Sequence, residues 1–103
     1  MLFRSLVKPA YIIVDTLIHD PETYEAYKAK VVPIVQSFGG EYLIRGGEMI
    51  IDQEELWSPT RMVLLKFPSV ERAKSFLDSD EYAPVKAMRL GASKATAVIV
   101  EGF

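Results

Sequence analysis

The ten-residue stretch FGGEYLIRGG, from Phe38 to Gly47, most constrains how this chain can fold. Gly39 follows a helix-like pattern, and glycine can end a helix in the left-handed conformation without a steric clash. The five large, alternating residues that follow suit a short strand, and the second glycine pair suits the tight turn that ends it. The stretch therefore predicts a helix end, a strand and a turn, with Arg45 at the end of the strand.

Strand-like and helix-like patterns alternate along the rest of the chain. Runs of β-branched and large apolar residues predict three further strands, at residues 11–17, 61–67 and 95–101. Apolar residues at helical spacing predict three helices, at residues 21–37, 70–77 and 79–91. Asp20 and Pro21 suit the start of the first helix as N-cap and first helical residue. The order β-α-β-β-α-β predicts a ferredoxin-like α+β fold, an antiparallel sheet with both main helices on one face.

Length and composition limit the possible classes of protein. A chain of 103 residues suits one domain, which we place at 10–103 behind an N-terminal arm of residues 1–9. Twelve basic and fourteen acidic residues leave a net charge of −2, which favours neither nucleic acid nor an anionic membrane as a partner. There is no cysteine, so disulfides and thiolate chemistry are excluded, and we expect a cytoplasmic protein. No apolar run approaches the roughly 20 residues that span a bilayer.

The predicted strands are apolar on both faces. In the strand at 61–67, Val63 and Leu65 alternate with Met62 and Leu64. The helices can cover only one face of the sheet, and the other would be an unusually large exposed apolar patch for a monomer. We therefore expect a homodimer in which a second copy packs on this face and closes a barrel-like core.

Several short motifs occur together in the order and spacing of a known family. They are YIIVD at 11–15, DP at 20–21, FGG at 38–40, LIRGG at 43–47, FPS at 67–69 and SDEY at 79–82. Over about residues 10–102 the chain resembles the bacterial domain-of-unknown-function family 1330, within the dimeric α+β barrel superfamily. The resemblance implies the same ferredoxin-like dimer, but Lys66 stands where members of that family usually carry an acidic residue.

The superfamily resemblance also implies a pocket between the helices and the sheet of each protomer. The superfamily includes cofactor-independent monooxygenases, lactone isomerases, and dehalogenating or decarboxylating enzymes. The polar residues that we expect in or near such a pocket are Arg45, Tyr27 and Lys66 as catalytic candidates, and Asp15, Tyr82, Trp57 and His19 as ligand-binding candidates. An arginine beside an apolar cleft can hold a carboxylate, and a tyrosine can donate a hydrogen bond to an enolate or carbonyl oxygen.

Each candidate also has a purely structural interpretation. Arg45 could pair with Glu41, with Glu48 or with the partner subunit. Lys66 could form a structural ion pair with Asp15.

The aromatic candidates and the histidine are equally open to a structural role. Tyr27 fits the apolar stripe of the first helix, and Tyr82 fits helix packing. His19 precedes the Asp20 cap on a loop, where we expect it to be exposed. Trp57 could cap a pocket or lie at the dimer interface.

We predict no metal site and no cofactor, since one histidine without cysteine makes a preformed metal site improbable and no phosphate-binding loop or nucleophile elbow occurs. The function that we expect is the binding of a small organic ligand, such as a carboxylate, in a cleft beside Arg45. A cofactor-independent isomerase- or oxygenase-type step is the activity that the resemblance implies. The alternative is a non-catalytic structural or regulatory dimer whose cleft is already filled by Tyr27, Phe38 and Tyr82.

Overall fold

The computed structural model describes residues 7–103; residues 1–6 of the predicted arm lie outside the described part. The elements, in chain order, are β1 (Ala10–Ile18), α1 (Pro21–Ser37), β2 (Glu41–Arg45), β3 (Met62–Phe67), α2 (Val70–Leu77), α3 (Ala83–Ala92) and β4 (Ser93–Glu101). The four strands form one sheet in the order β2-β3-β1-β4, and every neighbouring pair is antiparallel. The predicted ferredoxin-like α+β fold is confirmed.

The ends of α1 follow the predicted chemistry. The Asp20 carboxylate accepts a hydrogen bond from the backbone N–H of Thr23 at 3.2 Å and another from its hydroxyl at 2.7 Å. This satisfies a backbone donor that the first turn of a helix leaves free, and Pro21 occupies the first helical position. At the other end Gly39 has φ of +80°, the left-handed conformation that lets the chain leave the helix.

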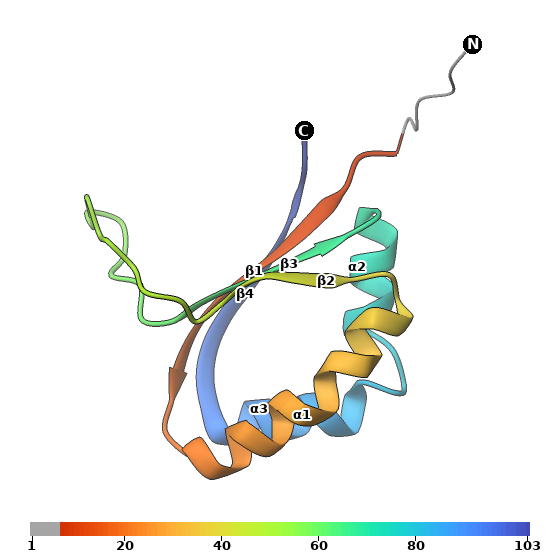
Figure 1. Cartoon of the computed structure of the whole chain (residues 1–103), viewed down its shortest axis with the longest axis horizontal. Helices are drawn as coiled ribbons and strands as arrows, with labels where there is room; N and C mark the ends of the chain where they lie inside the picture. The colour runs from red at the N-terminus through yellow and green to blue at the C-terminus, as the bar shows by residue number, and fades with distance from the viewer. Residues whose placement is uncertain (1–6) are drawn as a thin grey trace.

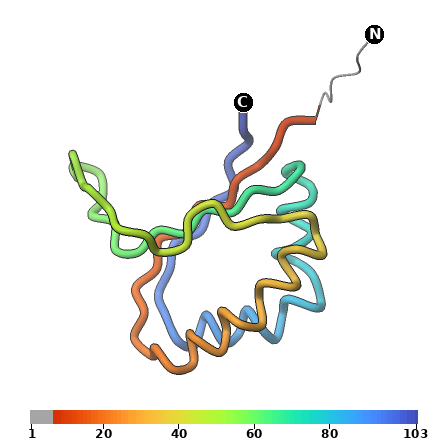
Figure 2. The backbone as a smooth tube through the Cα atoms, viewed as in Figure 1, coloured from red at the N-terminus to blue at the C-terminus, as the bar shows by residue number. Residues whose placement is uncertain are grey.

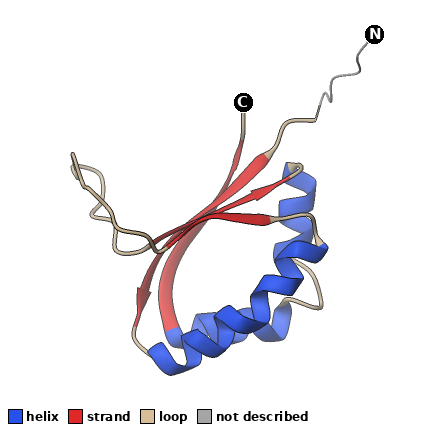
Figure 3. Cartoon of the chain, viewed as in Figure 1, coloured by secondary structure: helices blue, strands red, loops and turns tan. Residues whose placement is uncertain are grey.

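The helices all lie on one face of the sheet (Figures 1 and 3). The residues of β1 that face them include Ile12 and Val14, and their neighbours on β3 are Val63 and Leu65. The largest fully buried side chains are Phe67, Ile12, Val31, Val35 and Thr16. No helix in residues 7–103 has both the length and the apolar composition needed to cross a bilayer.

A one-residue bulge interrupts β2. Tyr42 pairs with Leu65 of β3, but Ile44 already pairs with Leu64, so Leu43 is an extra residue with no partner of its own. Since side chains alternate along a strand, the extra residue reverses the alternation beyond it. Tyr42 and Arg45 therefore both face the helices, although regular alternation would put them on opposite faces.

The connection between β2 and β3, residues 46–61, has no regular secondary structure and reaches away from the sheet (Figure 2). Its base is held by Asp15 of β1, whose carboxylate accepts hydrogen bonds from the backbone N–H groups of Thr60 (2.8 Å) and Arg61 (3.0 Å). The same carboxylate accepts a third bond from the indole N–H of Trp57 at 2.8 Å. Burial alone would raise the pKa of Asp15, but these three bonds and the backbone N–H of Thr16 outweigh it and lower the pKa.

The face of the sheet opposite the helices is largely apolar, and within residues 7–103 no helix covers it, although Trp57 reaches one part of it. Leu64, Ile13 and Val98 are cross-strand partners in one row on β3, β1 and β4. Val98 is 47% exposed, and Val100 on the same face is 45% exposed. We call this surface the open face. It is the unpaired apolar face that the alternation of the strands predicts.

Two glycine-to-alanine substitutions should have opposite effects on stability. A Cβ on Gly40 would lie 2.6 Å from the Phe67 ring and 2.8 Å from Val35, which are both fully buried. We expect Gly40→Ala to lower the free energy of unfolding by about 1–3 kcal/mol, because the core cannot yield. Gly91 lies within α3 with open space around the added atom, so Gly91→Ala should raise it by roughly 0.5–1 kcal/mol. Urea denaturation measures both, and equal effects would contradict the packing at Gly40.

Candidate functional site

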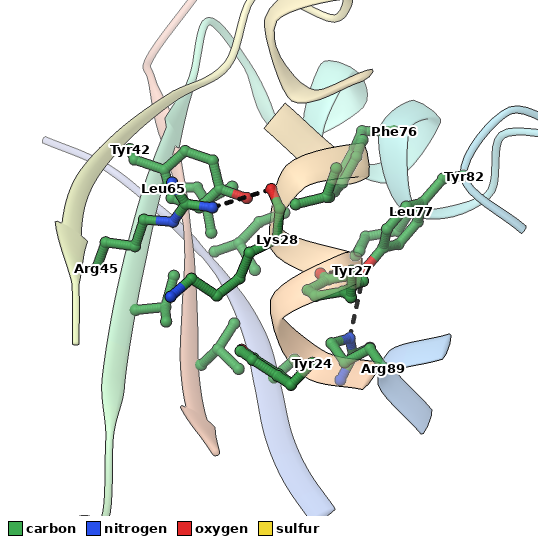
Figure 4. A pocket seen from close by; sticks show the side chains of 15 residues that line it. Tyr24, Tyr27, Lys28, Tyr42, Arg45, Leu65, Phe76, Leu77, Tyr82 and Arg89 are labelled. Atoms are coloured by element: carbon green, nitrogen blue, oxygen red, sulfur yellow. Dashed lines mark hydrogen bonds between the residues drawn. The ribbon is translucent and has the colours of Figure 1, made fainter. Parts of the chain in front are cut away.

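A small cavity lies between the helices and the sheet, with a volume of about 40 Å³ (Figure 4). Eight apolar side chains form most of its wall: Ile12, Val14, Val31, Val63, Leu65, Phe76, Leu77 and Ala97. The other lining residues are four tyrosines and three cations: Tyr24, Tyr27, Tyr42, Tyr82, Lys28, Arg45 and Arg89. No carboxylate is among these fifteen described residues, so the polar part of the wall is cationic and rich in hydrogen-bond donors.

A buried chain of hydrogen bonds occupies one end of the cavity. The hydroxyl oxygens of Tyr27 and Tyr82 lie 3.0 Å apart, and the Nε–H of Arg89 donates to the Tyr82 hydroxyl at 3.3 Å. The three residues come from α1, from the turn before α3 and from α3, so the cluster joins segments that are far apart in the sequence. Stacking of Tyr82 on Phe76, with ring centroids 4.3 Å apart, fixes the position of the phenol. We call these three residues the inner cluster.

Arg45 lies at the other end of the cavity, beside Lys28 and Tyr42 (Figure 4). Its guanidinium donates to the backbone carbonyl of Lys28 at 3.1 Å and stands over the Tyr42 ring, 4.7 Å from the centroid. The Lys28 ammonium pairs with Glu25 at 2.8 Å. Arg45 is exposed and Lys28 is half-buried, so we call this end the mouth. Arg45 thus binds a carbonyl and a ring instead of the glutamates that the sequence offered.

A further arginine supports the wall without lining it. The guanidinium of Arg61 donates to the Tyr24 hydroxyl at 3.2 Å and lies 5.4 Å from the centroid of that ring. The Tyr24 and Tyr27 rings are in turn 5.3 Å apart. The phenols on α1 are therefore held by contacts with both a cation and each other, and the positive charge near the cavity increases.

Two phenols of the cavity, Tyr27 and Tyr42, are held in the neutral form. Burial, reinforced by the neighbouring Tyr82, raises the pKa of Tyr27 above its usual value. Burial likewise raises the pKa of Tyr42 to about 12, against an opposing effect of Arg45. Burial of Arg89 opposes its charge, but the neighbouring phenols outweigh it and raise its pKa. At neutral pH Tyr27 and Tyr42 are therefore protonated and Arg89 is charged, so that all three are hydrogen-bond donors.

Three of the seven predicted site residues meet in the cavity: Arg45, Tyr27 and Tyr82. The sequence placed Tyr27 on the inward face of α1 and Arg45 at the end of β2, and both placements hold. The structural interpretation of Tyr27 and Tyr82 as helix packing is also correct, because both side chains are buried. They pack in the core and line the cavity at once.

The other four predicted residues lie elsewhere. Lys66 and Asp15 do not line the cavity, because they alternate with residues such as Leu65 and Val14 that face the helices. The predicted Lys66–Asp15 ion pair is wrong. Lys66 is the cross-strand partner of Tyr11, not of Asp15. Tyr11 and Asp15 are four residues apart on β1, so about 13 Å of strand separates the position of Lys66 from Asp15.

His19 and Trp57 also lie outside the cavity. His19 is exposed on the loop between β1 and α1, as expected from its place before the Asp20 cap. Trp57 is half-exposed and lines a separate hollow of about 340 Å³ on the open face, with Ile13, Met62 and Val98 among its neighbours. Of the two places proposed for Trp57, the structure therefore puts it on the side of the predicted interface and away from the cavity.

Sequence reasoning missed Arg89, Tyr42 and Lys28. Arg89 carried a weak signal, since it is seven residues after Tyr82 and therefore on the same face of a helical segment. Tyr42 and Lys28 carried none, because their position depends on the pairing of β2 with β3 and on the docking of α1. Within residues 7–103 no group of three or more histidine or acidic side chains is arranged to hold a metal ion.

The model of a family described as domain of unknown function, DUF1330, matches residues 9–103. The chain belongs to the DUF1330 family. This confirms the resemblance that the short motifs indicated, over nearly the whole chain. No curated protein matches this DUF1330 chain.

Solved structures share the fold of this DUF1330 chain at low sequence identity. The RPA0582 protein of unknown function from Rhodopseudomonas palustris has a TM-score of 0.75 and 15% identity, over 93% of this chain and 83% of that one. A hypothetical Arabidopsis thaliana protein has a TM-score of 0.66 and 13% identity, over 99% of this chain and 94% of that one. SnoaB, a cofactor-independent oxygenase from Streptomyces nogalater, has a TM-score of 0.65 and 9% identity, over 94% and 95%. At these identities the likeness establishes the fold alone.

Burial of the phenols predicts an alkaline loss of stability. An unfolded tyrosine ionises near pH 10, whereas Tyr42 in the folded chain ionises at about 12. The contribution of the neutral Tyr42 phenol to the free energy of unfolding is therefore fully present below pH 10. It is lost as the pH rises toward 12, by about 2 kcal/mol for this one group. Urea unfolding of wild type and Tyr42→Phe between pH 8 and 11.5 measures it. The variant should lose stability less steeply, and identical slopes would show that Tyr42 ionises as in the unfolded chain.

Proposed function

We propose that this protein binds a small organic anion in the cavity between its helices and its sheet, with a carboxylate held at the mouth by Arg45. One observation carries the proposal: the cavity is lined by three cations and four phenols and by no carboxylate. Such a wall presents donors and positive charge to a ligand, and it is otherwise apolar. An anionic group on a short apolar body matches both properties.

The size of the cavity limits the ligand. A volume of about 40 Å³ has room for a few water molecules, since one water needs about 10–15 Å³. A ligand with more atoms must enter by displacing side chains at the mouth, where Arg45 is exposed and exposed side chains change rotamer rapidly. These features favour a short-chain organic acid over a large polycyclic substrate.

The donors of the inner cluster also support a cofactor-independent reaction. The hydroxyl groups of Tyr27 and Tyr82, next to the charged Arg89, can stabilise negative charge on an enolate or carbonyl oxygen of a substrate. The same groups are poor general bases, because burial keeps Tyr27 protonated. A substrate would therefore need a proton acidic enough to pass to water, which would act as the base. An isomerase- or oxygenase-type step of this kind agrees with the fold shared with SnoaB, a cofactor-independent oxygenase.

Replacing Arg45 tests the proposal. Wild type should bind 4-methylpentanoate more tightly than the neutral 4-methylpentanamide, because the guanidinium forms a charge-assisted hydrogen bond with the carboxylate. We expect Arg45→Gln to weaken acid binding by about fivefold and to leave amide binding unchanged, as measured by isothermal titration calorimetry.

Arg72→Gln is the matched control. Arg72 is also exposed and also donates to a backbone carbonyl at α1, that of Phe38 at 3.4 Å, but it lies outside the cavity. The substitution Arg72→Gln removes the same charge as Arg45→Gln and should not change the affinity for the acid. Equal affinity for acid and amide in wild type, or equal effects of the two variants, would rule out the role of Arg45.

A non-catalytic dimeric module is the second candidate, and the small volume of the cavity favours it. Tyr27 and Tyr82 already form a hydrogen bond with each other and Phe76 stacks on Tyr82, so the helices pack together without any ligand. For this candidate the function lies in association through the open face, and the cavity is a packing defect. Failure of short organic acids and of their amides to bind would favour this candidate.

Both candidates include a homodimer, which we propose to form through the open face. The row of Leu64, Ile13 and Val98 lies at the centre of this face, and the exposed apolar surface continues along β4 to Val100. An apolar sheet face is costly to leave in water, and a two-fold axis would pair it with an identical surface. We also propose a cytoplasmic location, which the absence of cysteine supports.

A charge on the open face should prevent this association. Val98 is 47% exposed, so Val98→Glu fits the fold but would bury a carboxylate at the interface. We expect light scattering after gel filtration to report a dimer for wild type and a monomer for the variant, with unchanged circular dichroism. Leu90→Glu is the control, because Leu90 is 60% exposed on α3 and lies away from the open face. A wild-type monomer at micromolar concentration would contradict the dimer.

A further inference from the structure

The hydrogen bonds of the inner cluster leave one phenol proton uncommitted. Tyr27 and Tyr82 carry two hydroxyl protons between them, and the 3.0 Å bond that joins their oxygens uses one. The bond from Arg89 to Tyr82 uses a proton of the guanidinium and none of theirs. Whichever phenol donates to the other, the second proton has no acceptor among the hydrogen bonds of the described residues, so it is available to a ligand.

Arg89 favours one direction for this chain of bonds. A hydroxyl that accepts a bond from a cation is polarised and becomes a better donor. The arrangement Arg89 to Tyr82 to Tyr27 is therefore favoured, and it leaves the Tyr27 proton free. Tyr27 and Tyr82 both line the cavity, so a ligand oxygen in the cavity can accept the free proton. The raised pKa of Tyr27 supports this, because the phenol keeps its proton at neutral pH.

The inner cluster and the mouth are separate polar regions. Figure 4 shows Arg45 and Tyr42 on one side of the cavity, and Tyr82 and Arg89 on the other. The rest of the cavity wall is mostly apolar and includes Val31 of α1 and Leu65 of β3, which are aliphatic and buried. A ligand that satisfies both regions must carry an oxygen at each end of a short apolar segment.

From this geometry we infer that the cavity selects a short carboxylic acid that carries a second acceptor oxygen, a keto or enolate oxygen, which binds the free proton of the Tyr27–Tyr82 pair while Arg45 binds the carboxylate. This inference rests on the proposed function and adds to it the identity of the second group. A saturated acid of the same shape would fill the cavity but would leave the inner donor unpaired, which is unfavourable in a buried site.

Two acids of nearly equal shape test the inference. In 4-oxopentanoate the keto oxygen takes the place of one methyl group of 4-methylpentanoate, and the carboxylate is unchanged. We expect wild type to bind 4-oxopentanoate about fivefold more tightly, as measured by isothermal titration calorimetry at low ionic strength, since one buried hydrogen bond distinguishes the two. Equal or weaker binding of the keto acid would overturn the inference and leave the anion site intact.

The double variant Tyr27→Phe/Tyr82→Phe is required to remove the donor. In either single variant the remaining phenol loses its partner and keeps one free proton, so each should retain part of the preference for the keto acid. The double variant should bind the two acids equally. Tyr11→Phe is the matched control, because Tyr11 lies on β1 outside the cavity and its loss should leave the preference unchanged.

The outcomes separate the two hypotheses. A preference for the keto acid that survives in the folded double variant overturns the inference, because the donor would lie elsewhere. If the double variant does not fold, Arg89→Gln replaces it and should reduce the preference, since the polarising donor is lost. If wild type binds neither acid, the proposed anion site fails, and the inference fails with it.

Discussion

Side chains along a strand point alternately to the two faces of the sheet, and this alternation governs the rest of the molecule. On β1, Ile12 and Val14 face the helices, whereas Ile13 and Asp15 face away. Because all three helices lie on one side, the first pair helps to build a core and a cavity (Figure 1). The second pair lies on the open face. One constraint thus separates the candidate ligand site from the candidate subunit interface by the thickness of a single sheet.

The bulge at Leu43 shows how a local irregularity can decide the chemistry of a site. Without it, Tyr42 and Arg45 would face opposite sides of β2, and only one of them could reach the cavity. With it, the Arg45 guanidinium stands over the Tyr42 ring and bonds to the carbonyl of Lys28 on α1. The mouth of the cavity therefore depends on one extra residue in an edge strand, where bulges are common because pairing is incomplete on one side.

Local signals in the sequence were sufficient for the elements and their order. The Asp20 cap, the left-handed Gly39 and the β-branched strands each act over a few residues, and the structure has all of them. Membership of the DUF1330 family could also be recognised from short motifs. The candidate site was predicted in part. Arg45, Tyr27 and Tyr82 line the cavity and remain candidates, but Lys66 and Asp15 were assigned to the cavity although their alternation with Leu65 and Val14 puts them on the other face.

The sequence by itself determined the ferredoxin-like order of elements, the apolar character of both sheet faces and the placement of Tyr27 on the inward side of α1. These properties depend on residue type and on spacing within one element, and both can be read along the chain. Only the tertiary structure decided that Tyr27, Tyr82 and Arg89 form one hydrogen-bonded cluster and that Asp15 holds Trp57 instead of Lys66. Contacts of this kind join residues up to 55 positions apart, and they depend on strand register and helix docking, which no local pattern encodes.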